Sequence, residues 1–215
     1  GFDMAEHFQA FIHAPFSDDQ AADRNNTSLS LNVQLRDGAK YGQFMFYGDR
    51  EYPTIKRIFE ITEQNVQTAY LYWNVMLCAH HCSKAVMYWQ EEGEDTETFK
   101  QDIMDYFAKY SSGGEGYIVA SAQSDFTDGD GDNPPHGKAR RQYEKIIKAG
   151  RFLCTHEYPS MDKPEPIVFV IDAQTGFTLD DKRKQTEGPA ALSAAVAAAR
   201  GSAAPPAAQT TFGNA

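Results

Sequence analysis

Cysteine is scarce in this chain, whose 215 residues contain only Cys78, Cys82 and Cys154. An odd count in a chain long enough to bury a full core argues against a disulfide framework, so a reducing cytoplasm is the expected compartment. Cys78 and Cys82 flank two histidines, and a zinc-thiolate site is one interpretation of this spacing. No second Cys/His cluster completes a tetrahedral site, however. The alternative is that Cys78 is a buried strand residue and Cys82 a small turn residue.

Long apolar runs and an excess of basic residues are also missing. No uninterrupted apolar stretch approaches the roughly 18 residues of a membrane span, and no signal peptide is visible. The 20 Lys and Arg residues against 30 Asp and Glu give a net charge of -10, which argues against a simple basic groove for nucleic acid. It leaves room for an enzyme that holds nucleic acid through metal ions. The one dense basic cluster has helical spacing and is expected to be a solvated helix face: Lys138, Arg140, Arg141, Lys145 and Lys148.

The chain begins Gly-Phe-Asp rather than with methionine, so we expect a trimmed form or a piece of a larger protein. Its hydrophobic content of 41% and aromatic content of 13% are typical of a globular domain. Alternating polar and apolar residues over 28–35 predict a half-buried strand. Asp37-Gly38 predicts a hairpin turn, with the returning strand over 41–47. Pro53 predicts the first turn of a helix.

Further along, strands and helices alternate. We expect strands at 8–14, 69–79, 117–121, 152–155 and 167–171, and helices starting near Asp95 or Thr96 and spanning 137–149. This order predicts a layered α/β fold with a mixed sheet. Residues 1–178 are expected to form this domain. The alanine- and proline-rich residues 179–215 are expected to form a tail or linker.

Two strand ends carry side chains that suit a metal. Asp49 follows Gly48 after an apolar run, and His80 and His81 stand where the run 73–79 stops. Carboxylate and imidazole groups suit zinc or manganese, so the sequence offers part of a metal site. The alternatives are that Asp49 caps the following helix and that both histidines are packed strand-end residues. His7, His13 and His156 have no motif around them and are expected to be structural.

The acidic segment from Asp125 to Asn133 is similar to a calcium loop. An EF-hand would need glycine where Asn133 stands and glutamate where Ala139 stands, so a flexible acidic loop is favoured.

A series of motifs then occurs in order. An Asn-x-Ser-Leu strand at 26–29 leads to Gly48-Asp49, then to Ala79-His80-His81-Cys82-Ser83, to Asn133-Pro-Pro-His136, and to Thr155-His-Glu157. This order resembles the C-terminal half of metallo-β-lactamase-fold hydrolases, and most closely the hydrolase domain of ComEC-type bacterial competence proteins. The resemblance covers residues 8–176.

The resemblance implies half of an αββα fold and a two-metal site for Zn²⁺ or Mn²⁺. By this resemblance Asp49 bridges the metals and acts in catalysis with His81, and His80 or His81 is a metal ligand. His136, at the site entrance, and Ser83 are the implied substrate-binding residues. Metal-assisted hydrolysis of a phosphoester, nucleic acid included, is the implied reaction.

The chain also departs from the family. The central His-x-His-x-Asp-His motif and the next metal histidine are absent, and Cys82 and Ala79 stand where the family has glycine and proline. Two interpretations follow. The chain is either the C-terminal half of a hydrolase whose N-terminal half lies elsewhere or on a partner chain, or a degenerate relative that serves as an interaction module. In either case the chain alone is expected to be a poor hydrolase.

Overall fold

The computed structural model describes residues 2–3, 7–16, 25, 27–129 and 133–180. The chain divides into two units, Gly1–Leu179 and Asp180–Ala215. The expected tail lies outside the described residues, apart from Leu179 and Asp180, and so do residues 130–132 of the acidic loop. Within the described part no helix has both the length and the apolar composition needed to cross a membrane.

The first unit is a layered α/β structure with a mixed sheet, as the sequence predicts. Its strands are β1 (Phe2–Asp3), β2 (Phe8–Ala14), β3 (Ser30–Asp37), β4 (Lys40–Phe46), β5 (Val75–Leu77), β6 (Tyr88–Trp89), β7 (Thr98–Phe99), β8 (Tyr117–Ala120), β9 (Phe152–Cys154), β10 (Phe169–Asp172) and β11 (Gly176–Leu179). Its helices are α1 (Tyr52–Gln64), α2 (Gln101–Tyr110) and α3 (Gly137–Lys145), with short 3-10 turns at Thr68–Tyr70, Ala79–His81 and Lys84–Val86.

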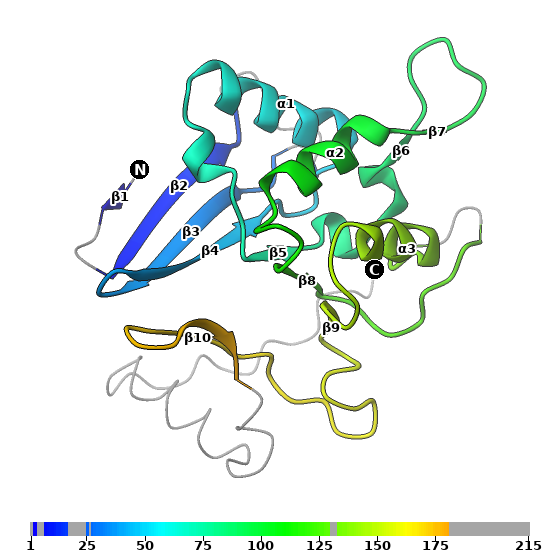
Figure 1. The fold of residues 1–215 in the computed structure, drawn as a ribbon. Coiled ribbons are helices and arrows are strands. Elements are labelled where there is room, and N and C mark those ends of the chain that lie inside the picture. The colour runs from blue at the N-terminus through cyan, green and yellow to red at the C-terminus, as the bar shows by residue number, and fades with distance from the viewer. Residues whose placement is uncertain (1, 4–6, 17–24, 26, 130–132, 181–215) are drawn as a thin grey trace, which may run out of the picture. The chain divides into compact units, whose positions relative to one another are not determined.

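Seven strands form the main sheet in the order β1-β2-β3-β4-β5-β8-β9 (Figure 1). The strands from β1 to β4 pair antiparallel, whereas β4, β5, β8 and β9 pair parallel. The β3–β4 hairpin closes at the expected turn, with Asp37 opposite Lys40 and Gly38 at a φ of 56° that favours glycine. This confirms the predicted hairpin.

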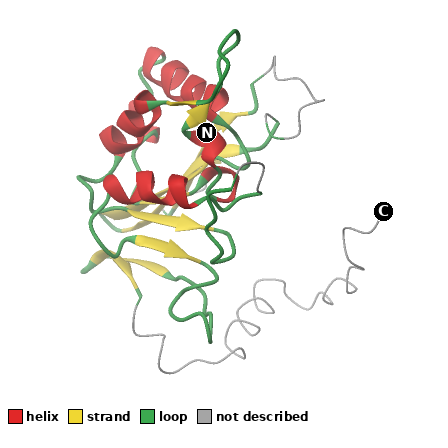
Figure 2. Ribbon diagram, turned by 90° about the vertical axis from the view of Figure 1, so that its right-hand side faces the viewer, coloured by secondary structure: helices red, strands yellow, loops and turns green. Residues whose placement is uncertain are grey.

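The three helices cover one face of the sheet, and the β10–β11 hairpin lies on the other side (Figures 1 and 2). Pro53 lies in the first turn of α1, which buries Ile55, Ile58 and Phe59 as the sequence predicts. Helix α2 adds Phe107, and α3 adds Tyr143 to the same core. Burying one apolar stripe of each helix against the sheet is the interaction that layers the fold.

The opposite face of the sheet carries two apolar rows. In the first row Phe44 lies opposite Val33 and beside Val75 and Tyr117, and the β10–β11 rings Phe169 and Phe177 lie 6.2 Å from Phe44. A second row lies two residues away, toward the end of the sheet where β4, β5 and β8 finish. From here on, 'the apolar row' means only this second row, which consists of Ile12, Leu31, Phe46, Leu77, Val119 and Leu153. Because side chains alternate across a strand, all six share the face that carries β10–β11. Ile12 is 48% exposed, and all the others except Val119 are half-buried.

Three sequence predictions are wrong in detail. The strand expected over 69–79 is limited to Val75–Leu77, because a 3-10 turn occupies Thr68–Tyr70. Helix α2 starts at Gln101, since residues 98–99 pair as β7 with β6. Helix α3 ends at Lys145, four residues before the predicted end. The residue pattern does not predict strands β1, β6, β7 and β11.

His13 of β2 is buried and structural, as expected. Its Nε2 lies 3.0 Å from the Tyr70 carbonyl, which can only accept, so Nε2 carries the proton. Its Nδ1 lies 3.1 Å from the Thr62 hydroxyl, which can donate to it. Burial lowers the pKa of His13 from 6.5 to about 4, although the Tyr70 hydrogen bond opposes the shift.

This depressed pKa predicts an acid-dependent loss of stability. The folded state favours neutral His13, so the contribution is complete above pH 6.5 and is lost as the pH falls toward 4, by about 3 kcal/mol. Urea unfolding at pH 7 and pH 4 should show that His13→Gln removes this part of the pH dependence. His7→Gln, a change at an exposed histidine, is the matched control and should leave it unchanged. Equal pH dependence in wild type and His13→Gln would contradict the assignment.

Candidate functional site

The candidate site lies where the parallel strands end. Strands β4, β5 and β8 run in the same direction, so the segments that follow them meet at one edge of the sheet. Asp49 follows β4, His81 follows β5 and Ser121 follows β8. The carboxyl ends of parallel strands are the common location of binding sites in α/β folds. The structure therefore brings Asp49 and His81 together, as their positions in the sequence suggested.

His81 presents one ring nitrogen to Asp49. Its Nδ1 lies 2.8 Å from the Ser121 carbonyl oxygen, an acceptor, so Nδ1 carries a proton. In the neutral ring the lone pair is then on Nε2, which lies 3.5 Å from Oδ1 of Asp49. Two groups that can only accept face each other across this gap, and a proton or a metal cation between them makes the contact favourable.

The gap suits two ligands of one metal ion. The two atoms are close enough for one zinc ion to contact both, since zinc–ligand bonds are about 2.0–2.1 Å long and the separation is 3.5 Å. Metal-binding histidines commonly donate their other N–H to a backbone carbonyl, as His81 does to Ser121. The side chains of His81 and Asp49 are 53% and 47% exposed, so an ion has access to both.

His80 faces a different carboxylate. Its Nδ1 lies 3.5 Å from Oε1 of Glu51, and the same oxygen accepts a hydrogen bond from Asn25 at 3.3 Å. Glu51 raises the pKa of His80 despite partial burial, and the Asp49 charge adds to the increase. A ring held by its own carboxylate, with its charged form favoured, is a poor metal ligand. The sequence could not distinguish the two histidines, but these contacts favour His81 as the ligand.

An unusual backbone holds both histidines. His80, His81 and Cys82 have φ angles of 46°, 54° and 67°, three consecutive left-handed residues without glycine. Each such residue costs of order 1 kcal/mol, and strain of this kind concentrates at functional sites. The His80 N–H donates to the Gly48 carbonyl at 2.9 Å, which ties the turn to the residue before Asp49.

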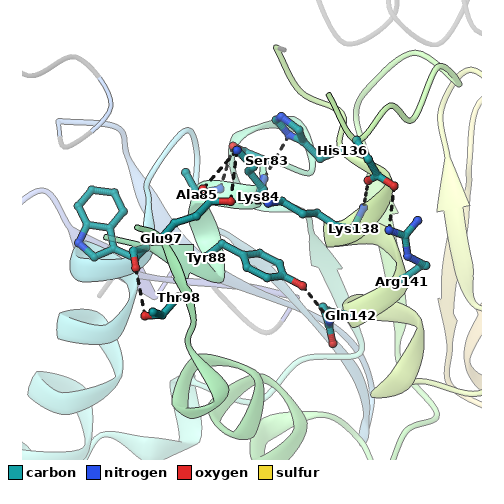
Figure 3. Close-up of polar contacts among 12 residues, drawn as sticks. Ser83, Lys84, Ala85, Tyr88, Glu97, Thr98, His136, Lys138, Arg141 and Gln142 are labelled. Atoms are coloured by element: carbon teal, nitrogen blue, oxygen red, sulfur yellow. Dashed lines mark hydrogen bonds and ion pairs between the residues drawn. The ribbon is translucent and has the colours of Figure 1, made fainter. Parts of the chain in front are cut away.

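Ser83 and His136 lie beneath this turn rather than in the open site. The Ser83 hydroxyl accepts from the Ala85 N–H at 3.2 Å and caps the next 3-10 turn. His136 is only 2% exposed, and its Nδ1 accepts from the Lys84 N–H at 3.2 Å (Figure 3). The backbone N–H of His136 donates to the Cys82 carbonyl at 3.1 Å. These contacts attach the histidine turn to the start of α3.

The basic cluster on α3 is largely neutralised. Lys138 pairs with Glu97, as does Lys84 at 3.2 Å, and Arg141 pairs with Asp128 at 2.8 Å (Figure 3). Arg140 reaches Glu157 at 3.2 Å. The cluster thus joins loops around the site rather than presenting free positive charge.

The three cysteines are free and buried. Burial raises the pKa of the Cys78 thiol, and a hydrogen bond with Cys82 adds to the increase. Among the residues that the structure describes, no three His, Cys, Asp or Glu side chains converge well enough to hold a metal ion. Within the described part, Asp49 and His81 are therefore a pair of candidate ligands and not a group of three.

A pocket opens beside His81. Its volume is about 550 Å³, and it is lined by His81 together with residues of the segments 121–127 and 133–135. This size is typical of small-molecule sites. Sequence reasoning missed both this pocket and the roles of Glu51 and Ser121, because backbone carbonyls and loop walls leave no signal in the residue pattern.

No family model, no curated protein and no solved structure matches this chain.

Proposed function

We propose that this chain contributes Asp49 and His81 to the centre of a metal-dependent hydrolase that acts on phosphoesters. The observation that carries the proposal is the 3.5 Å approach of His81 Nε2 and the Asp49 carboxylate, with the His81 ring oriented by the Ser121 carbonyl. A zinc or manganese ion held there would polarise a phosphoryl oxygen and lower the pKa of bound water. Glu51 and His80 would position the turn.

A two-metal site needs more ligands than this chain provides, and the apolar row indicates where they come from. The row runs across the strands, along the end of the sheet that carries Asp49 and His81, and most of it is only half-buried. A sheet normally buries an apolar face against another layer. We infer that the missing N-terminal half, or a partner chain, covers the row and brings further ligands. The left-handed Cys82, where the resembling family has glycine, also fits this proposal.

A second candidate keeps the fold without chemistry. The same half-covered row, together with the two-ligand site, would suit an interaction module whose metal centre has degenerated. In both candidates the unpaired cysteines suit a reducing cytoplasm.

A direct test compares the isolated chain with the longest native form of the protein. Zinc and manganese binding would be measured by calorimetry, and hydrolysis with bis(p-nitrophenyl) phosphate. We expect weak binding and negligible turnover for the isolated chain, and tight binding with turnover for the longer form. Absence of turnover in the longer form would favour the interaction module. Robust turnover by the isolated chain would show that its site is complete.

A further inference from the structure

A second, smaller pocket lies on the helix-covered face of the sheet. Its volume is about 140 Å³. Its floor is a row of three glutamines, in which Gln9 of β2 lies opposite Gln34 of β3, and Gln34 lies opposite Gln43 of β4. Met45, two residues after Gln43, belongs to the core under the helices, so the glutamines share that face. A face that is apolar around Met45 is therefore polar at this pocket.

Two buried amides fix the wall of this pocket. The Gln43 amide Nε2 donates to the Ala69 carbonyl at 2.9 Å, and the Asn32 amide Nδ2 donates to the Tyr72 carbonyl at 2.9 Å. These bonds attach the segment 69–72 to strands β3 and β4. A pocket that is already formed binds a ligand without a large ordering cost.

The same two amides leave their oxygens without donors. Backbone carbonyls can only accept, so the nitrogen of each amide must face its carbonyl and the oxygen must point elsewhere. Asn32 is 1% and Gln43 8% exposed, and neither amide oxygen accepts a hydrogen bond from a described residue. Both residues line the pocket, so a donor can reach these oxygens from there. Nearly buried acceptors without a partner are costly, and N–H donors on a ligand would satisfy them.

A cation and a hydroxyl stand at the same pocket. The Arg36 side chain is exposed, and its Nε donates to Oε1 of Gln34 at 2.9 Å. Its two terminal nitrogens form no ion pair with any described carboxylate, and a guanidinium is suited to hold one. The Tyr70 hydroxyl accepts from Gln9 at 3.3 Å, so its own proton can be donated as well. The lining thus offers acceptors for N–H groups together with donors for a carboxylate.

We propose that this pocket binds a free α-amino acid with a small side chain. The ammonium group donates to the amide oxygens of Asn32 and Gln43, and the carboxylate pairs with Arg36. The volume limits the ligand to a few heavy atoms, since a single water accounts for about 30 Å³ of liquid. The half-buried ring of Phe11, stacked on Tyr70 at 4.2 Å, supplies an apolar surface for the side chain. This site is independent of the proposed metal centre.

Amide NMR titrations of the ¹⁵N-labelled chain test the proposal with three probes of nearly equal shape. L-Alanine carries both charged groups, isobutyrate has a methyl group in place of the ammonium, and isopropylamine has a methyl group in place of the carboxylate. L-Alanine should give saturable shifts at the side-chain amides of Asn32 and Gln43 and at the backbone of Tyr70. Each analogue should bind at least about tenfold more weakly, because it lacks one set of charge-assisted hydrogen bonds.

Variants at two exposed arginines locate the carboxylate contact. Arg36→Gln should weaken L-alanine at least about tenfold and leave the affinity for isopropylamine unchanged. Arg141→Gln on α3, the matched control, should bind L-alanine as wild type does. The spectra themselves report whether each variant is folded. No saturable shift with L-alanine, an analogue that binds as tightly, or full L-alanine affinity in Arg36→Gln would overturn the proposal.

Discussion

Hydrolysis of bis(p-nitrophenyl) phosphate by the longest native form should fall more than about 100-fold when Asp49 is replaced by asparagine. The change keeps the shape of the side chain and removes the charge that faces Nε2 of His81. His81→Ala should cause a similar loss. His80→Ala should cause a smaller one, because His80 contacts Glu51 and acts through the turn.

The matched control is Asp105→Asn, which should retain full turnover. The Asp49 side chain is about half exposed, so its substitution should leave the urea midpoint unchanged. Zinc affinity, measured by calorimetry, should fall in parallel with turnover in Asp49→Asn and His81→Ala. Turnover that survives Asp49→Asn at unchanged metal affinity would rule out this residue as a ligand.

Gly116→Ala should destabilise the fold by about 3 kcal/mol, since overpacking a filled core is costly. A Cβ at Gly116 would lie 2.8 Å from Cε3 of Trp73, closer still to Cζ3, and 3.2 Å from the Asn74 carbonyl. Trp73 cannot easily move, because it is fully buried and its Nε1 donates to the Phe107 carbonyl at 3.2 Å. Urea unfolding would measure the loss.

Two further variants locate the cause of this effect. Gly93→Ala adds a Cβ with nothing within 4 Å, so it should cost only about 1 kcal/mol from its positive φ. Trp73→Leu creates space, so the double variant with Gly116→Ala should be more stable than the sum of the single effects predicts. Strict additivity would mean that the Trp73 ring is not what Gly116 accommodates.

Local patterns predicted much of the fold. The alternation over 28–35 and the Asp37-Gly38 turn each express a local rule, and the structure confirms the hairpin that they predict. The strand predicted over 69–79 is too long. The aromatic and apolar residues at its start are typical of a strand, but the structure has a 3-10 turn at Thr68–Tyr70 and a strand only at Val75–Leu77. The two-residue strands β6 and β7 are too short to leave a periodic signal.

The site was predictable only in part. Strand ends indicated that Asp49 and His81 would meet, because that follows from the parallel order. The choice between the two histidines depends on ring orientation, which Ser121 and Glu51 fix from distant parts of the chain. The resemblance implied that His136 lies at the site entrance, whereas its ring is buried and accepts a hydrogen bond from the distant Lys84 N–H, a contact that leaves no local pattern.

One hydrogen bond links the Asp49–His81 pair to the pocket beside it. The Ser121 carbonyl orients His81, and Ser121 also lines the pocket. Any occupant that shifts this carbonyl changes the direction of the Nε2 lone pair and with it the affinity for a cation. Thermodynamic linkage is reciprocal, so under the proposed function a cation at His81 would alter the affinity for such an occupant by the same factor. Pocket and ion would thus act as heterotropic effectors of one another, and their coupling energy can be measured by titrating either ligand in the presence of the other.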